Sequence, residues 1–209
     1  MKYDPEPDLL AQAIECPSDI SNEPHSMLVL RVRSKPWIAS AAAHVSVDGE
    51  SYLQIADSIP HVVGVELLED MDLEWETSSV LVRLLGPDVN LLRVLSDGDW
   101  RIGRQPMLLG REWCFVRETE AIGDGLYHVH GILRGRFESH RKAHPRGAKG
   151  FVSDVRHLEP VRDASVRPGY TIWLKTQPYS GKALPLTSCE AVQCSFGTPA
   201  VIRSEGKQP

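Results

Sequence analysis

Short apolar runs separated by polar turns recur along most of the chain, which is the pattern of a meandering antiparallel β protein. From residue 27 onward these runs are rich in Val, Ile, Leu and Tyr. No segment beyond residue 20 keeps a 3.6-residue periodicity for more than about two turns, so helices layered on a sheet are not expected. The expected strands cover residues 27–34, 43–47, 52–58, 80–85, 89–95, 105–109, 112–118, 126–133, 150–155, 171–175 and 191–196.

Two glycine-containing turns predict hairpins within this pattern. Asp48-Gly49 separates two expected strands in the first half of the chain. Gly123-Asp124-Gly125 separates two longer ones and marks the clearest hairpin. Glycine adopts positive φ at little cost, and aspartate tolerates it, so both sequences suit tight turns.

The N-terminal segment differs from the rest. In residues 5–14 a proline and acidic residues precede the apolar positions, which predicts a short amphipathic helix with an acidic start. Residues 16–26 have the composition of a linker. We therefore expect a mainly β fold of antiparallel sandwich or barrel-like lobes with a short N-terminal helix. The expected units are a helix-and-linker arm over residues 1–26, a first β lobe over 27–100, and a second β lobe with a C-terminal extension over 101–209.

Composition supports a folded chain. Its 209 residues are 42% hydrophobic and 24% charged, enough to bury a core and unlike a disordered chain. The longest apolar stretches, such as residues 27–32, are far short of the roughly 20 residues that a bilayer crossing needs, so no membrane span is expected. Acids at positions 4, 6 and 8 replace the basic start of a secretory signal, so we expect synthesis and assembly in a cytoplasm.

The side chains that carry most enzyme chemistry form no known signature. The chain lacks the GxxxxGK[ST], GxSxG and HExxH motifs, so we expect neither nucleotide binding nor enzymatic activity. A Ser-His-Asp triad stays open, because all three residue types occur, but nothing points to one. His128 and His130 share one face of an expected strand and are metal-ligand candidates. A half-exposed hairpin face is the favoured alternative, and a cluster titrating near pH 6 is a third. We expect no metal and no cofactor.

The four cysteines are Cys16, Cys114, Cys189 and Cys194, and they form no CxxC pair. Buried free thiols are favoured over a disulfide or a metal site, and all three remain open. The five tryptophans are Trp37, Trp75, Trp100, Trp113 and Trp173. Exposed aromatic faces stack on sugars, although most tryptophans of β proteins lie in cores or interfaces.

Charge is unevenly distributed around the net value of −5. Residues 66–76 contain six acids and no base, whereas residues 132–150 contain six bases and one acid. Such segregation suits complementary contacts, and two unrelated solvated faces are the alternative. Because Phe137 is the only aromatic residue of the basic segment and the overall pI is about 5.9, no nucleic-acid binding is expected.

The basic segment carries a resemblance to a known family. Its sequence Gly131-Ile132-Leu133-Arg134-Gly135-Arg136, followed by His140, His144, Gly147 and Phe151-Val152, resembles the C-terminal region of the hub, or host-specificity, proteins of siphophage tail tips and gene transfer agents. There a hairpin leads into a GLLRGRRGT sequence. This chain departs from the family after Arg136, where Phe137-Glu138-Ser139 replaces Arg-Gly-Thr, and family members are much longer.

Three upstream segments extend the resemblance in the same order. Residues 37–55 are similar to a W…V..S.DG..Y hairpin of the family, residues 80–85 to its VRL strand, and residues 110–117 to its GDEIlQFR strand. The resemblance thus covers about residues 27–155 and extends toward residue 196. It implies a structural virion component of a bacteriophage tail tip or baseplate, assembled as a homotrimer in the hub at the distal end of the tail. The implied partners are hub, tail-tube or distal tail, and fibre proteins. A receptor- or glycan-binding module of the same tail tip is the alternative.

Two glycines bracket the arginines of the basic segment. They let the backbone turn tightly, so that Arg134 and Arg136 present planar guanidinium groups for bidentate pairing. The acidic segment is one possible partner, in the same subunit or a neighbour, and a fixed loop within one subunit is the alternative. The candidate assembly-interface residues are Gly131, Arg134, Gly135, Arg136, Arg141, Glu69, Asp70 and Asp72.

Overall fold

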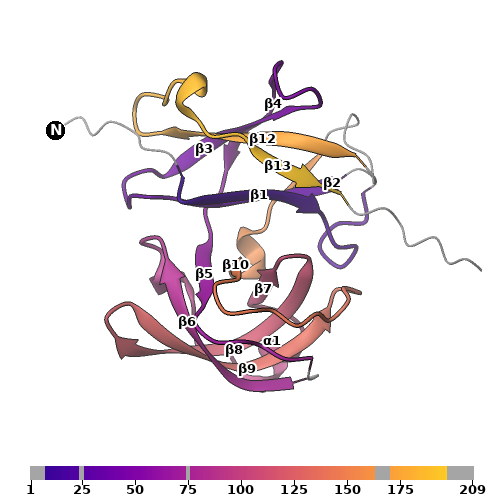
Figure 1. The fold of residues 1–209 in the computed structure, drawn as a ribbon, viewed down its shortest axis with the longest axis vertical. Helices are drawn as coiled ribbons and strands as arrows, with labels where there is room; N and C mark the ends of the chain where they lie inside the picture. The colour runs from indigo at the N-terminus through magenta and orange to yellow at the C-terminus, as the bar shows by residue number, and fades with distance from the viewer. Residues whose placement is uncertain (1–7, 24–25, 74–75, 163–169, 197–209) are drawn as a thin grey trace, which may run out of the picture.

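The chain folds into two stacked β bodies, a barrel and a pair of sheets above it (Figure 1). The computed structural model describes residues 8–23, 26–73, 76–162 and 170–196. All strand pairs are antiparallel, so the expected mainly β fold with sandwich or barrel-like lobes is confirmed. Among the described residues, no helix combines the length and apolar character needed to cross a membrane.

Six strands close the barrel in the order β10-β5-β6-β9-β8-β7. They are β5 (Val63–Leu67), β6 (Glu76–Leu85), β7 (Pro106–Leu109), β8 (Glu112–Gly123), β9 (Leu126–Arg136) and β10 (Lys149–Val152). Closure pairs every edge and removes the exposed strand edges of an open sheet. The hairpin of β8 and β9 is the longest pairing, and it turns at Asp124 and Gly125 with φ of 52° and 73°, as the turn sequence predicts.

Alternate side chains of these strands fill the barrel interior. In β6, Val80, Val82 and Leu84 point inward between more exposed neighbours. Val65 and Ile132 meet them there without any exposed surface. The core is therefore a packed apolar interior, which is the main favourable contribution to folding.

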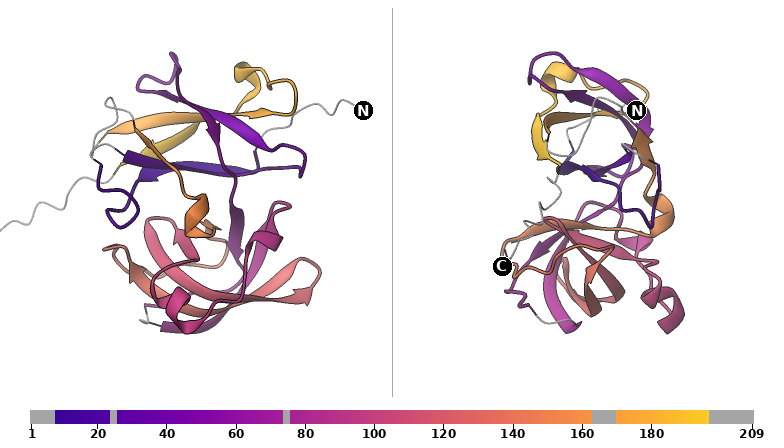
Figure 2. Two further views of the ribbon diagram at one scale, coloured as in Figure 1. Left: turned by 180° about the vertical axis from the view of Figure 1, so that it is seen from behind. Right: turned by 90° about the vertical axis from the view of Figure 1, so that its right-hand side faces the viewer.

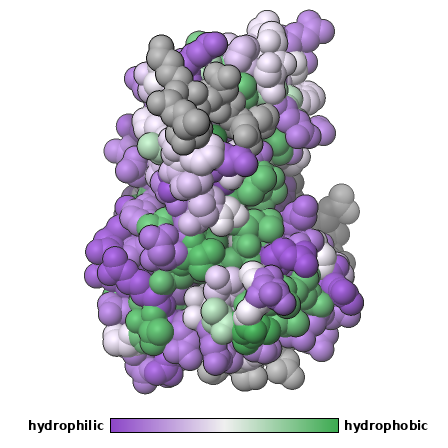
Figure 3. Space-filling view, turned by 90° about the vertical axis from the view of Figure 1, so that its left-hand side faces the viewer, coloured by the Kyte–Doolittle hydropathy of each residue, from purple (hydrophilic) through white to green (hydrophobic). Residues whose placement is uncertain are grey.

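Two sheets form the upper body, in the orders β1-β2-β11 and β13-β12-β3-β4. Their strands are β1 (Leu10–Glu15), β2 (Ser26–Val32), β3 (Ser40–Ser46), β4 (Leu53–Ile59), β11 (Pro160–Arg162), β12 (Thr171–Tyr179) and β13 (Val192–Ser195). Met27 and Val29 face the core between the sheets, whereas Leu28 and Leu30 face a cluster that includes Trp113 of the barrel. Strand β2 is buried at all seven positions because it packs against both bodies. On the side of the molecule drawn in Figure 3, hydrophobic surface gathers around the middle of the molecule.

The expected N-terminal helix over residues 5–14 is wrong where the structure describes it. Strand β1 takes its place and pairs with β2 at six positions, so tertiary pairing outweighs the local helix signals. Residues 1–7 of the expected arm lie outside the described residues. Two strands of the barrel, β5 and β6, precede residue 100, and the other four follow it. The sheets are therefore not divided at the expected boundary between the two lobes. Figure 2 shows from two further sides that the chain crosses between the bodies more than once.

The remaining differences concern short segments. The expected strand over residues 89–95 is wrong, because Val89–Leu91 forms a 3-10 helix and the chain that follows is irregular. Strands β1, β5 and β11 were not among the expected ones. The one α-helix in the described part of the chain is α1 (Asp97–Arg101), which begins after Ser96, whose hydroxyl accepts from Asp99 N at 3.2 Å. Two further 3-10 helices cover Val155–His157 and Leu186–Ser188.

Candidate assembly site

A buried carboxylate, Glu112, lies at the centre of the candidate site. It begins β8, and its side chain is 1% exposed. Arg134 of β9 donates to both carboxylate oxygens, from Nε at 2.6 Å and from Nη2 at 2.7 Å. The backbone amides of Gly135 and Lys142 donate at 3.1 and 2.9 Å, and His144 Nε2 lies 2.9 Å from Oε2. Every oxygen lone pair of this carboxylate is thus engaged.

These contacts set the charge state of Glu112. Burial alone would raise its pKa, but the hydrogen bonds from His144, Arg134 and Lys142 N outweigh that effect and lower the pKa to about 2. For Arg134, burial lowers the pKa, but Glu112 outweighs it and the pKa is raised. Both groups are therefore ionised at neutral pH, and the pair is a structural element that does not exchange protons there.

Arg134 makes the expected bidentate pair with a carboxylate, but the partner is Glu112 of the same chain and not the acidic segment. Its remaining donors go to the backbone carbonyls of Asp72 and of Lys142, the latter from Nη2 at 2.5 Å. The reason is a β-bulge, where the register shifts by one residue opposite Cys114 and Gly135 takes a φ of 62°. The bulge sends Arg134 toward Glu112 in the interior and leaves Arg136 half-buried at the surface.

Segments of opposite charge do meet within the chain, but mainly through backbone atoms. Met71 and His144 exchange two backbone hydrogen bonds, of 2.8 and 2.9 Å. Gly147 N donates to Leu67 O at 2.7 Å, and Arg146 N donates to Asp70 Oδ1 at 2.7 Å. The pairing extends the β5–β10 ladder beyond β5 and fixes the basic loop, which corresponds to the fixed-loop alternative.

The other candidate residues have separate environments. Arg141 Nη1 donates to Leu73 O at 2.7 Å, and Glu69 Oε1 accepts from Leu81 N at 2.6 Å. Gly131 has a φ of 61°, and a Cβ there would lie 2.8 Å from Arg117 Cβ. The structure therefore gathers Arg134, Gly135, Arg141 and the acidic segment at one barrel end and leaves Gly131 outside this group.

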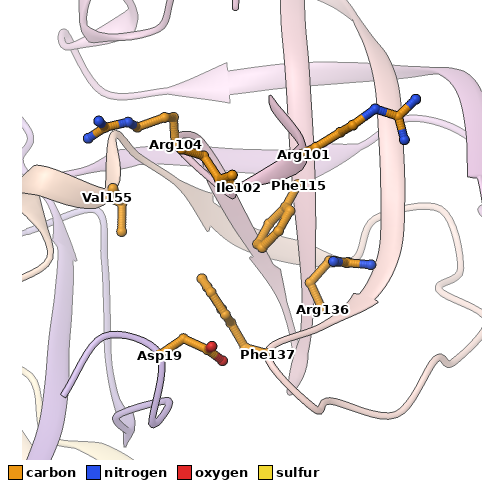
Figure 4. Close-up of a pocket in the computed structure, with 8 residues that line it drawn as sticks. All are labelled: Asp19, Arg101, Ile102, Arg104, Phe115, Arg136, Phe137 and Val155. Atoms are coloured by element: carbon orange, nitrogen blue, oxygen red, sulfur yellow. The ribbon is translucent and has the colours of Figure 1, made fainter. Parts of the chain in front are cut away.

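A surface pocket lies beside Arg136, at a place where the sequence predicted no site. Its volume is about 440 Å³ (Figure 4). The guanidinium carbon of Arg136 lies 4.9 Å from the centroid of the Phe115 ring. The only signal for it in the sequence was the departure at Phe137 from the family pattern. The lining residues are Asp19, Arg101, Ile102, Arg104, Phe115, Arg136, Phe137 and Val155.

The histidine pair lies on the hairpin of β8 and β9, away from Glu112. The ring centroids of His128 and His130 are 5.8 Å apart. His130 Nε2 lies 3.1 Å from Glu120 Oε2, and His128 Nδ1 lies 3.3 Å from Ser79 Oγ. Within the described ranges, no group of three or more His, Cys, Asp or Glu side chains has a metal-binding arrangement.

The four cysteines are buried and form no disulfide. Burial raises the pKa of Cys16 to about 11 and raises that of Cys114 further. A thiol with a raised pKa is a poor nucleophile at neutral pH. These side chains contribute to packing, as Cys114 does in the barrel core and Cys194 in the upper one.

The tryptophans divide by exposure. Trp100 and Trp113 are buried, and Trp173 is half-buried beside Gly49. Trp37 is 39% exposed, and the ammonium group of Lys35 lies 6.0 Å from its ring centroid. Trp75 lies outside the described residues. Among the described tryptophans, Trp37 is therefore the most exposed.

Comparisons with known proteins add no family to these observations. No protein-family model matches the chain. No curated protein matches it either.

Proposed function

We propose that this chain is a non-enzymatic structural subunit of a bacteriophage tail tip, which assembles into the hub or baseplate at the distal end of the tail. The ordered resemblance over residues 27–155 carries the proposal. In its support, the segments 80–85, 110–117 and 131–152 fold into one barrel, in which β6, β9 and β8 are adjacent. Segments that resemble one family and also fold together are what we expect if they were inherited as one unit.

The geometry around Glu112 fits a structural role. Its carboxylate is saturated by internal donors, and its pKa of about 2 is far from neutral, so it is poorly suited to acid–base catalysis. The network instead fixes the loop between β9 and β10 through buried side chains and backbone amides. A pre-formed loop loses little conformational entropy when it enters an interface.

The proposed partners are other tail proteins, namely hub, tail-tube or distal tail, and fibre proteins, in a particle that contains the chain as a homotrimer. The proposed location is the virion, after assembly in the host cytoplasm. A receptor- or glycan-binding module is the alternative, for which Trp37 offers the exposed ring. Binding to a glycan array that disappears in Trp37→Ala would favour that alternative.

Inactivation of the gene in a phage that encodes it tests the proposal. We expect tails without a complete tip, and restoration of infectious particles by the wild-type gene supplied in trans. Mass spectrometry of purified particles should find the chain in a fixed ratio to the other tail proteins. Normal particles from the inactivated phage, together with a stable monomer absent from wild-type particles, would refute the proposal.

A further inference from the structure

The pocket beside Arg136 is a socket of mixed apolar and charged walls at the junction of the two bodies. Its walls come from the barrel, through Phe115 and Phe137, and from the segment around Val155 that leads to the upper sheets. In Figure 4 the two phenylalanine rings and Val155 face the centre, whereas the guanidinium groups of Arg101 and Arg136 point away from Val155. The centre of the pocket therefore suits an apolar side chain.

An unusual backbone conformation builds one wall of this socket. Phe137 and Glu138 have φ of 49° and 58°, a backbone conformation that residues other than glycine rarely adopt. The turn is held by Ser139, whose N and Oγ both donate to Arg136 O, at 3.0 and 2.6 Å. It places the Phe137 ring edge-on to Trp113 and Phe115, at centroid distances of 5.5 and 5.0 Å. The rings are thus fixed before any ligand arrives.

The rim of the socket is cationic. Arg101, Arg104 and Arg136 line it, against one carboxylate, Asp19. Arg136 Nε is buried and has no hydrogen-bond partner within the described residues. The guanidinium group of Arg104 is more exposed, and it reaches Asp99 only at 3.5 Å. An apolar centre ringed by guanidinium groups matches an apolar side chain flanked by carboxylates.

The chain itself carries such a segment. Leu73 is 57% exposed, and Asp70 and Asp72 precede it. The carbonyls of Asp72 and Leu73 are held by Arg134 and Arg141, the latter at 2.7 Å, so the backbone under the exposed leucine is fixed. An apolar anchor on a fixed backbone binds at a low cost in conformational entropy.

We propose that Leu73 of one copy inserts into this pocket of a second copy, with Asp70 and Asp72 pairing with the arginine rim. Charge complementarity between the rim and the acidic segment selects this occupant. The contact joins two different surfaces, so it is heterologous and closes into a ring or continues as a filament. It rests on the proposed assembly function and names the surfaces through which copies associate.

Site-directed cross-linking of the full-length protein tests this contact. The four native cysteines are buried, so Leu73→Cys on one chain and Ile102→Cys on another each supply one accessible thiol. Ile102 is 69% exposed at the pocket. When the two variants, distinguished by a mass tag, are mixed and oxidised, we expect cross-linked heterodimers. Leu53→Cys, at a 64% exposed position on β4, is the matched control and should not cross-link to Ile102→Cys.

Sedimentation velocity supplies a second, independent readout. Leu73→Asp should weaken self-association about tenfold or more, the loss expected from an apolar anchor. Arg104→Glu should also weaken it, and Asp72→Lys in the same chain should restore part of the loss. A wild-type chain that stays monomeric, or cross-linking no stronger than the control, would overturn the proposal. Either result combined with incorporation into particles would leave the tail-tip function standing and remove only this contact.

Discussion

Two buried ion pairs, one in each body of the molecule, show how differently a carboxylate fares inside a protein. In the barrel, Glu112 and Arg134 share two hydrogen bonds, and the remaining polar atoms meet backbone groups and His144. In the upper body, Asp8 and Arg31 share one contact, of 2.7 Å. Asp8 Oδ2 and Arg31 Nη2 have no well-formed hydrogen bond within the described residues.

The pKa shifts of the two carboxylates have opposite signs. Burial raises the pKa of Asp8, and the attraction of Arg31 and a nearby Thr176 hydroxyl do not compensate. Burial likewise lowers the pKa of Arg31 against the effect of Asp8. At Glu112 the effect of the hydrogen-bond donors outweighs the effect of burial, and the pKa falls to about 2. Burial and an opposite charge are therefore not sufficient, and the number of hydrogen bonds decides whether a buried pair stabilises the fold.

The largest expected effect is the loss of the Glu112 charge. Glu112→Gln leaves Arg134 buried without a counter-charge, and we expect a loss of about 3–5 kcal/mol in the free energy of unfolding. Denaturant titration followed by fluorescence measures it. Glu66→Gln is the matched control, because its exposed pair with Arg83 contributes less than about 1 kcal/mol. Equal small losses in the two variants would show that the Glu112 network does not hold the barrel.

Acidification should affect the two pairs in opposite directions. The folded-state pKa of Glu112, about 2, lies below its ordinary value of 4.5, so its contribution is complete above that value and is lost as pH falls toward 2. The shift corresponds to a loss on the order of 3 kcal/mol. The raised pKa of Asp8 acts in the opposite direction, because protonation then favours the folded state. Unfolding measured across this range should have a shallower pH dependence in Glu112→Gln, and an unchanged dependence would contradict the assignment.

The bulge that turns Arg134 inward supplies a smaller test. Gly135→Ala puts a side chain at φ 62° and its Cβ 2.8 Å from Arg141 Cγ, and we expect a loss of about 2 kcal/mol. Gly110→Ala is the control, because its φ is 60° and nothing lies within 4 Å of the added Cβ, so only the backbone cost of about 1 kcal/mol remains. Identical thermal stabilities for the two variants would show that the Arg141 side chain moves away from the added Cβ at no cost in stability.

The smallest expected change comes from removal of the upper pair as a whole. Asp8→Leu combined with Arg31→Met should leave the free energy of unfolding unchanged or raise it by about 1 kcal/mol, because apolar side chains replace an incompletely satisfied pair. Denaturant titration of the double variant measures this change. A loss as large as that of Glu112→Gln would show that the two buried ion pairs contribute equally to the free energy of unfolding.

The local features of the sequence predicted where the strands lie far better than which segments they pack against. The β8–β9 hairpin was predictable, because alternating residues flank Gly123-Asp124-Gly125. The strand β1 was not, because its conformation depends on pairing with β2. The burial of Arg134 also escaped prediction, since its partner Glu112 lies 22 positions away and only the bulge at Gly135 brings them together. The pocket walled by Phe137 depends on a positive φ that no residue preference indicates.

A reconstruction of purified phage particles in which this chain carries an antibody label tests the central claim most directly. The proposed function predicts label density at the distal end of the tail, arranged around the tail axis. Label density confined to another part of the particle, or its absence from particles of a phage that expresses the chain, would contradict it.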